Sequence, residues 1–189
     1  MGLDSVELVM GVEKYFSISI PDREAEKAAT VGRLVNCVAS IKGIQTYNFA
    51  LRETTFKKIQ GQLINKSKIT DQIGSALEFN NQKELTELES KIGLKLPGLK
   101  ISSGKSPSLF SKFKNWIGID PIYDFQKTVW KRYIDVILSY NLERVVNPTA
   151  ISSKYEIYLA IMRLTADKIG VDYFEIGLEK SFTDDLGVD

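Results

Sequence analysis

LDSVELVMGVEKYFSISIPD, residues 3–22, is one of two stretches that decide how this chain folds. Its apolar side chains recur mostly at steps of three and four residues, which predicts an amphipathic helix; they are Leu3, Val6, Val9, Met10, Val12 and Phe16. Pro21 cannot continue a helix and biases Ile20 towards an extended backbone, so we expect the helix to stop before Ile18. The polar residues 22–27 then predict a short turn or helix.

The second stretch, IGVDYFEIGLEKSFTDDLGVD at residues 169–189, lies at the other end of the chain. It follows an amphipathic pattern over residues 152–169, which predicts a helix. Gly170 is placed to stop that helix. The residues after Gly170 predict a long, ordered loop.

Helical patterns also fill the chain between these two stretches. Thr30 is a natural N-cap for a helix that buries one apolar stripe, made of Val31, Leu34, Val35, Val38 and Ile41. Gly93 is a predicted helix stop, and residues 98–108 are the best linker candidate. Further helices are expected over about 49–63, 80–92, 109–117 and 121–138.

The residue types present argue against several classes of enzyme and metal site. The chain contains no histidine, which removes histidine-based acid–base catalysis, the serine and cysteine nucleophiles that need histidine, and the usual zinc sites. Cys37 is the one cysteine, so no internal disulfide can form. No phosphate-binding glycine motif is present. We therefore expect a protein that is not an enzyme and holds no metal.

Targeting signals are also missing from the sequence pattern. Apolar runs are only a few residues long, too short to cross a bilayer as a helix. The first residues lack the basic and apolar regions of a signal peptide. A membrane-surface role for the aromatic residues of 109–117 is the alternative to a core-facing helix there. A cytoplasmic location is expected.

Charge is distributed unevenly along the chain. Residues 1–40 carry six acidic and four basic side chains, and residues 151–189 carry eight and four. Residues 41–150 carry ten acidic and seventeen basic side chains. One interpretation is ordinary solvated surface; the other is that acidic ends and basic middle dock on each other or on separate partners. Nucleic-acid binding is not predicted, because the basic middle lacks a recognisable binding module.

Read together, the two ends resemble the acyl carrier protein family. SFTDDLG at residues 181–187 is similar to the end of that family's long first loop, and LDSVELVM at 3–10 is similar to its second helix. The sequence SIPD at 19–22 resembles the turn that follows, and TVG at 30–32 the start of a later helix. The resemblance implies an all-α, four-helix carrier bundle.

The order of these elements is inverted relative to the family, because the family's first helix comes last here. This implies a circular permutation, which bundles with neighbouring ends tolerate. We expect carrier-like helices at residues 1–42, a central basic helical domain of unassigned role at 43–148, and the carrier-like first helix and loop at 149–189. The bundle closes within one chain, or two chains exchange their last helices as a domain-swapped homodimer.

The resemblance also bears on the attachment site of 4'-phosphopantetheine, which the family carries on a serine at the start of its second helix. Ser5 offers a quick match, but an alignment without gaps keeps every apolar position in phase and places Ser5 one turn inside the helix. Gly2 then occupies the position of the modified serine and Asp189 that of the aspartate before it. Ser5 as attachment site, and Ser5 as a helix cap, are the alternatives.

Function follows from the resemblance in two versions. In the first, the protein is an acyl-carrier-like protein of fatty-acid or polyketide metabolism, whose acidic second helix, with Asp4, Glu7 and Glu13, docks on basic faces of acyl-chain synthases or transferases. In the second, it is a protein-interaction or structural module that keeps the carrier fold without the prosthetic arm.

Overall fold

The structure, a computed structural model, describes residues 3–64, 82–97 and 124–188. Gly2, Asp189, the linker candidate 98–108 and the aromatic segment 109–117 lie outside the described residues. Helices and turns make up the described part, with a single isolated bridge between Thr30 and Ser181. This confirms the all-α prediction.

The chain divides into two compact units. Unit 1 comprises Met1–Phe49 with Leu138–Asp189, and unit 2 comprises residues 50–137. The central domain predicted over 43–148 does not have the same boundaries as unit 2, and it stays a prediction. Each unit is described by itself below.

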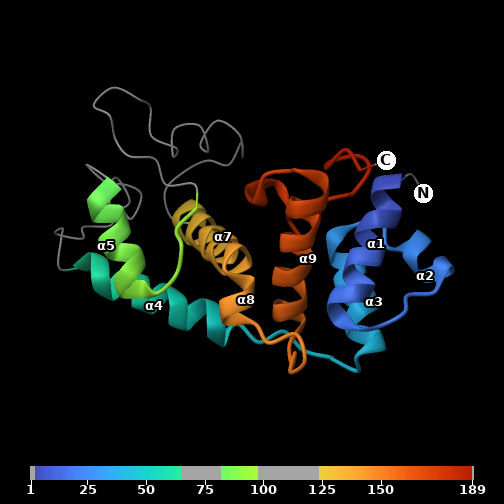
Figure 1. The fold of residues 1–189 in the computed structure, drawn as a ribbon, viewed down its shortest axis with the longest axis horizontal. Coiled ribbons are helices and arrows are strands. Elements are labelled where there is room, and N and C mark those ends of the chain that lie inside the picture. Colours follow the sequence, from blue (N-terminus) through green and yellow to red (C-terminus); the bar gives the residue numbers. More distant parts are fainter. Residues whose placement is uncertain (1–2, 65–81, 98–123, 189) are drawn as a thin grey trace. The chain divides into compact units, whose positions relative to one another are not determined.

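Unit 1 contains the helices predicted from both ends of the sequence (Figure 1), which are α1 (Leu3–Phe16), α2 (Asp22–Lys27), α3 (Val31–Ile41) and α9 (Lys154–Ile169). It also contains α8 (Leu142–Val145) and the 3-10 turn η2 (Tyr173–Glu175), which the sequence pattern did not predict. Helix α9 packs against both α1 and α3, and α2 packs against α3. Segments at opposite ends of the sequence therefore share one core.

The core of unit 1 comes from one stripe each of α1 and α3 and from the whole circumference of the first half of α9. Helix α1 buries Leu8, Val12 and Phe16, and α9 buries half of its residues. The predicted stripe of α3 is confirmed for Val31, Leu34, Val35 and Val38, but the expectation for Ile41 is wrong, because its side chain is 43% exposed. Ile41 is the last residue of α3.

Local signals fix the helix ends of unit 1. The Thr30 hydroxyl accepts a hydrogen bond from Arg33 N, and Ser153 and Glu156 form a capping box at the start of α9. Gly170 ends α9 in the left-handed conformation, with φ of 79°. Helix α1 instead ends at Phe16 and is followed by Ser17, a non-glycine residue with φ of 52°. The predicted N-cap and the predicted glycine stop are therefore confirmed.

Unit 2 contains three described helices, α4 (Ala50–Ile64), α5 (Gln82–Ile92) and α7 (Asp124–Tyr140), of which the last three residues of α7 belong to unit 1. Helix α4 packs on α5. The Arg52 guanidinium holds the buried Asp135 carboxylate through two hydrogen bonds of 2.7 and 2.9 Å. Such bidentate pairing satisfies a carboxylate that would be costly to bury alone.

Candidate functional site

The start of α1 is where the sequence places the candidate site. Asp4 and Ser5 lie in the first turn of this helix, and both side chains are partly exposed. The first N–H groups of a helix have no partner within it, and the helix dipole makes this end favourable for a negative charge. The N–H groups of the first turn of α1 are therefore suited to bind a phosphate group.

A C-terminal arm, residues 170–188, lies in the same unit as α1. Four buried side chains anchor it: Ile176, Phe182, Leu186 and Val188. In Figure 1 the beginning of α1 and the segment that ends at Val188 lie at the same end of unit 1. The arm therefore ends inside the core, at the pole where α1 begins.

Backbone hydrogen bonds join this arm to the start of α3. Val31 N donates to Lys180 O at 3.0 Å, Gly32 N donates to Leu178 O at 2.8 Å, and Phe182 N donates to Ala29 O at 3.0 Å. The arm thus satisfies two of the N–H groups that the first turn of α3 would otherwise leave open. These three bonds connect residues that are about 150 positions apart in sequence.

The three predicted docking carboxylates occupy different environments. Glu7 is exposed and Asp4 is partly exposed, so both are available to a partner. Glu13 is only partly exposed, and its Oε1 accepts a hydrogen bond from Ile20 N at 2.7 Å. Glu13 therefore stabilises the turn after α1 with one of its oxygens.

Two apolar side chains accompany these carboxylates on the outside of α1. Val6 is 41% exposed and Met10 is 61% exposed, although the sequence pattern counted both among the apolar residues of the helix. They lie one turn apart, so they share a face. The pattern also missed Leu8, which is buried. The signal that separates the faces is the spacing of four residues from Leu8 through Val12 to Phe16.

Three further titratable groups of unit 1 have structural explanations. The N–H of Ser181 donates to the Asp185 carboxylate, which lowers the pKa of Asp185, and nearby Lys180 lowers it further. Asp184 accepts a hydrogen bond from the Ser181 hydroxyl within the same turn. Burial raises the pKa of the Cys37 thiol, which makes this cysteine a poor nucleophile.

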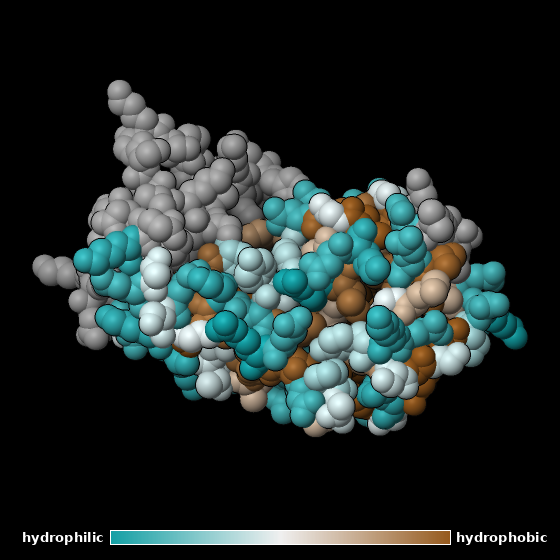
Figure 2. Space-filling model, viewed as in Figure 1, coloured by the Kyte–Doolittle hydropathy of each residue, from teal (hydrophilic) through white to brown (hydrophobic). Residues whose placement is uncertain are grey.

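Within residues 3–64, 82–97 and 124–188, no cluster of three or more histidine, cysteine or acidic side chains is arranged to hold a metal ion. In the same ranges, no helix is long and apolar enough to cross a membrane. Figure 2 shows apolar residues at the surface of unit 1 interspersed with hydrophilic ones.

Part of the chain is similar in sequence to acyl carrier proteins. It is 58% identical over 40 residues to that of Wolinella succinogenes, which is 21% of this chain and 53% of the relative. For Picosynechococcus sp. the identity is 56% over 41 residues (22% and 51%), and for Clostridium acetobutylicum it is 53% over 36 residues (19% and 47%). This confirms the resemblance for about a fifth of the chain.

The chain spans about half the length of these relatives. No protein-family profile matches the sequence, and no solved structure matches the fold.

Proposed function

We propose that unit 1 is an acyl-carrier-like module with a circularly permuted chain, which presents α1 to enzymes of acyl-chain metabolism. In this proposal α1, α2 and α3 correspond to the last three helices of a carrier, and α9 with the C-terminal arm corresponds to the first helix and long loop. The packing of α9 on α1 and α3 supports this correspondence.

The observation that carries the proposal is the junction between the arm and α3. The hydrogen bonds from Val31 N and Gly32 N to arm carbonyls join the two ends of the sequence within one molecule. They also favour closure within one chain over a domain-swapped homodimer, since no second molecule is needed to complete the unit.

The two segments of unit 1 that precede and follow unit 2 in the sequence are joined by hydrogen bonds. Lys154 N, at the start of α9, donates to Thr46 O at 3.0 Å, and Asn48 N donates to the Ser153 hydroxyl at 2.8 Å. The segments that lead into unit 2 and out of it therefore lie near the end of α3 and the beginning of α9. In this proposal unit 2 is an insertion that connects what would be the two ends of an unpermuted carrier.

For the prosthetic arm, we propose that Gly2 occupies the attachment position and that Ser5 is part of the helix rather than the carrier serine. Ser5 is the third residue of α1 and is only partly exposed. A residue just before the helix is better placed for a phosphodiester, because it faces the unpaired N–H groups. The wild-type chain then docks on carrier-binding enzymes without carrying 4'-phosphopantetheine.

Docking would use the exposed face of α1. Asp4 and Glu7 supply negative charge, and Val6 and Met10 supply apolar contact area. The partners are basic faces of acyl-chain synthases or transferases, which such a face attracts electrostatically. Glu13 contributes less, because one of its oxygens is already bonded within the chain.

The test combines loading and competition. The protein is incubated with coenzyme A and a broad-specificity phosphopantetheinyl transferase, and its intact mass is recorded. We expect no change for the wild type and for Ser5→Ala, and a gain of one prosthetic arm for Gly2→Ser, with or without Ser5→Ala. A wild-type gain that Ser5→Ala abolishes would make Ser5 the attachment site.

Competition tests the docking itself. Unlabelled wild-type protein should slow transfer of the arm to a conventional acyl carrier protein, and Glu7→Lys should weaken this competition. Glu175→Lys, which reverses an exposed carboxylate in the C-terminal arm, is the matched control. If Gly2→Ser stays unmodified and the wild type does not compete, the carrier-like function is refuted and only a structural module is left.

A further inference from the structure

The outer face of α1 is not acidic along its whole length. Glu7, Met10 and Lys14 follow one another at steps of three and four residues, so they form one stripe along the helix. All three side chains are exposed, Met10 to 61%. From its N-terminal end this stripe therefore presents a negative charge, an apolar side chain and a positive charge. The two charged residues are separated by about 10 Å along the helix axis.

Lys14 supplies the charge that a partner meets at the C-terminal end of this stripe. Glu13 is the one carboxylate in residues 10–16, but it lies about 100° around the helix from Lys14. Its Oε1 also accepts the hydrogen bond from Ile20 N at 2.7 Å. Among the described residues, no ion pair involves Lys14. The Lys14 ammonium group is therefore presented to solvent, whereas the adjacent carboxylate is partly engaged within the chain.

Helix α9 adds a second positive charge beside the stripe. Lys168 is exposed, and its Cε lies 3.7 Å from the position that a Cβ atom on Gly11 would take. Gly11 lies between Glu7 and Lys14 along α1, on the flank that packs on α9. Lys168 therefore reinforces the positive charge of the second half of the stripe.

Two carboxylates from other elements act on a different side of α1. Burial, followed by the charges of Glu143 and Glu156, raises the pKa of Tyr15. Tyr15 lies about 100° around the helix from Lys14, in the direction opposite to Glu13. Glu156 is also held in the capping box of α9. These two carboxylates therefore border the flank of α1 and leave Lys14 as the charge on its outer stripe.

We propose that Lys14 is a specificity-determining residue, which decides which protein surfaces the outer face of α1 accepts. The inference rests on the proposed docking role of α1. A partner face that is basic throughout is attracted at Asp4 and Glu7 but repelled at Lys14. The partner that fits is a protein surface with a basic group opposite Glu7 and an acidic group opposite Lys14, about 10 Å apart.

The probe is a phosphopantetheinyl transferase with a basic carrier-binding face, and its binding is measured by calorimetry. At about 20 mM salt Lys14→Glu should bind it about threefold or more tightly than the wild type does, and this difference should shrink at about 500 mM salt. Lys14→Gln, which removes the charge without adding a carboxylate near the end of the helix, should lie between the two. Circular dichroism checks that the variants keep their helices. Equal or weaker binding by folded Lys14→Glu and Lys14→Gln overturns the proposal.

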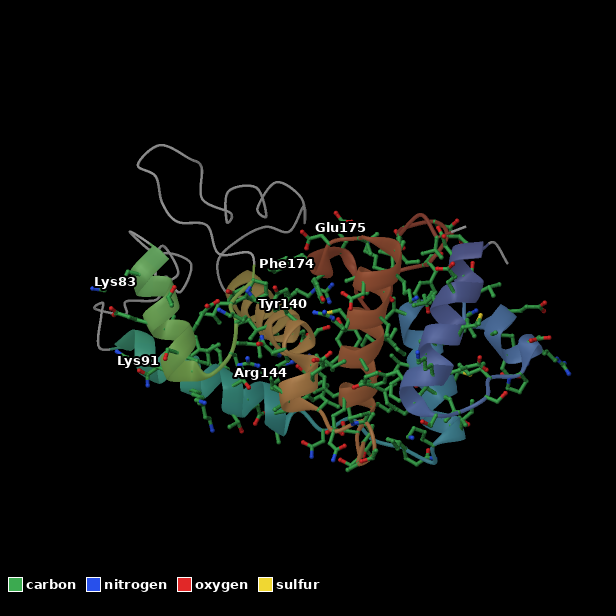
Figure 3. The ribbon with its side chains drawn as sticks, in the orientation of Figure 1. Lys83, Lys91, Tyr140, Arg144, Phe174 and Glu175 are labelled. Atoms are coloured by element: carbon green, nitrogen blue, oxygen red, sulfur yellow. The ribbon has the colours of Figure 1, made fainter. Side chains whose placement is uncertain are left out.

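A compensating substitution separates the stripe from the net charge of the protein. Glu175 is exposed, and Figure 3 shows it on η2, on the side of α9 away from α1. The double variant Lys14→Glu/Glu175→Lys has the net charge of the wild type and should keep the tighter binding of Lys14→Glu. If the double variant binds like the wild type, net charge explains the gain and the proposal is overturned.

The acidic part of the partner surface is tested on the transferase itself. The basic residues of its carrier-binding face are replaced by glutamate one at a time. At one position the replacement should strengthen binding of the wild type and weaken binding of Lys14→Glu, because the two proteins present opposite charges there. If no replacement acts in opposite directions on the two proteins, the proposal is overturned.

The outcomes also distinguish this inference from the proposed function. If the wild type binds the transferase and Lys14→Glu binds it no more tightly, only the inference about Lys14 fails. If neither protein binds and Gly2→Ser stays unmodified, the proposed function fails and the inference fails with it.

Discussion

Replacing Gly32 with alanine tests the junction between the C-terminal arm and α3. Gly32 is the second residue of α3, and its N–H donates to Leu178 O at 2.8 Å. A Cβ atom built on Gly32 would lie 2.8 Å from the same oxygen. Real Cβ atoms do not approach a backbone oxygen so closely, and a backbone oxygen cannot rotate away as the end of a side chain can. Alanine would therefore push the arm off the start of α3.

The magnitude follows from opposing contributions. Alanine is favoured over glycine in a helix by up to about 1 kcal/mol. Against this, overpacking costs about 1–3 kcal/mol, and losing the bonds donated by Val31 N and Gly32 N costs about 0.5–1.5 kcal/mol each. We expect Gly32→Ala to lower the free energy of unfolding of unit 1 by about 1–5 kcal/mol, the range that these contributions span.

Gly11→Ala is the matched control. Gly11 lies inside α1 in the same unit, and a Cβ atom there would meet only Lys168 Cε, at an ordinary contact distance of 3.7 Å. This substitution should stabilise the unit, by up to about 1 kcal/mol. The two glycine-to-alanine changes should therefore have opposite signs.

Hydrogen exchange followed by mass spectrometry is the suitable assay. Both tryptophans, Trp116 and Trp130, belong to unit 2, so unit 1 has no tryptophan of its own to serve as a fluorescent probe. Peptides that cover α3 and the arm should exchange faster in Gly32→Ala, while the same peptides should be unchanged or slower in Gly11→Ala. If both substitutions slow exchange, the arm does not contact α3 as described.

Three further predictions concern unit 1. Ser17→Gly should raise the free energy of unfolding by about 0.5–1 kcal/mol and with it the midpoint of urea unfolding. The reason is that Ser17 has φ of 52°, a conformation that glycine adopts without steric cost. A lower midpoint would contradict this. Phe182→Ala should lower the free energy of unfolding by about 3–5 kcal/mol, because the ring is only 7% exposed. Limited proteolysis should then cleave the C-terminal arm first. If the arm stays as resistant as in the wild type, Phe182 does not anchor it. The lowered pKa of Asp185 means that its carboxylate stabilises the folded state above the ordinary pKa of 3.8, and that this contribution is lost as the pH falls through the lowered value. An NMR titration should give Asp185 a pKa below 3.8. Asp185→Asn should remove the contribution of this carboxylate to the loss of stability at low pH. A pKa at or above 3.8 would contradict the hydrogen bond from Ser181 N to Asp185.

Helix limits in unit 1 were predictable because their signals are local. Thr30 caps α3 with its own side chain, Gly170 accepts a positive φ, and Pro21 excludes continuation of a helix. Each of these acts on neighbouring backbone atoms, so reading a few residues is enough. The resemblance of part of the chain to acyl carrier proteins was likewise readable from short motifs.

The choice of buried face was not predictable in the same way. Helical periodicity groups Val6 and Met10 with the core residues of α1, yet both are exposed, while Leu8 is buried. Adjacent stripes of one helix differ by a small rotation, and the position of the packing partner decides between them. For α1 that partner is α9, which lies far away in the sequence.

The sequence by itself determined the helices, their ends and the family that part of the chain resembles. Only the tertiary structure decided that the arm pairs with the start of α3, that Glu13 bonds to Ile20 N, and that Arg52 meets Asp135 across 83 positions. The physical reason is that capping and backbone preference act between neighbours, whereas a hydrogen bond or ion pair between distant segments forms only after packing has brought them together.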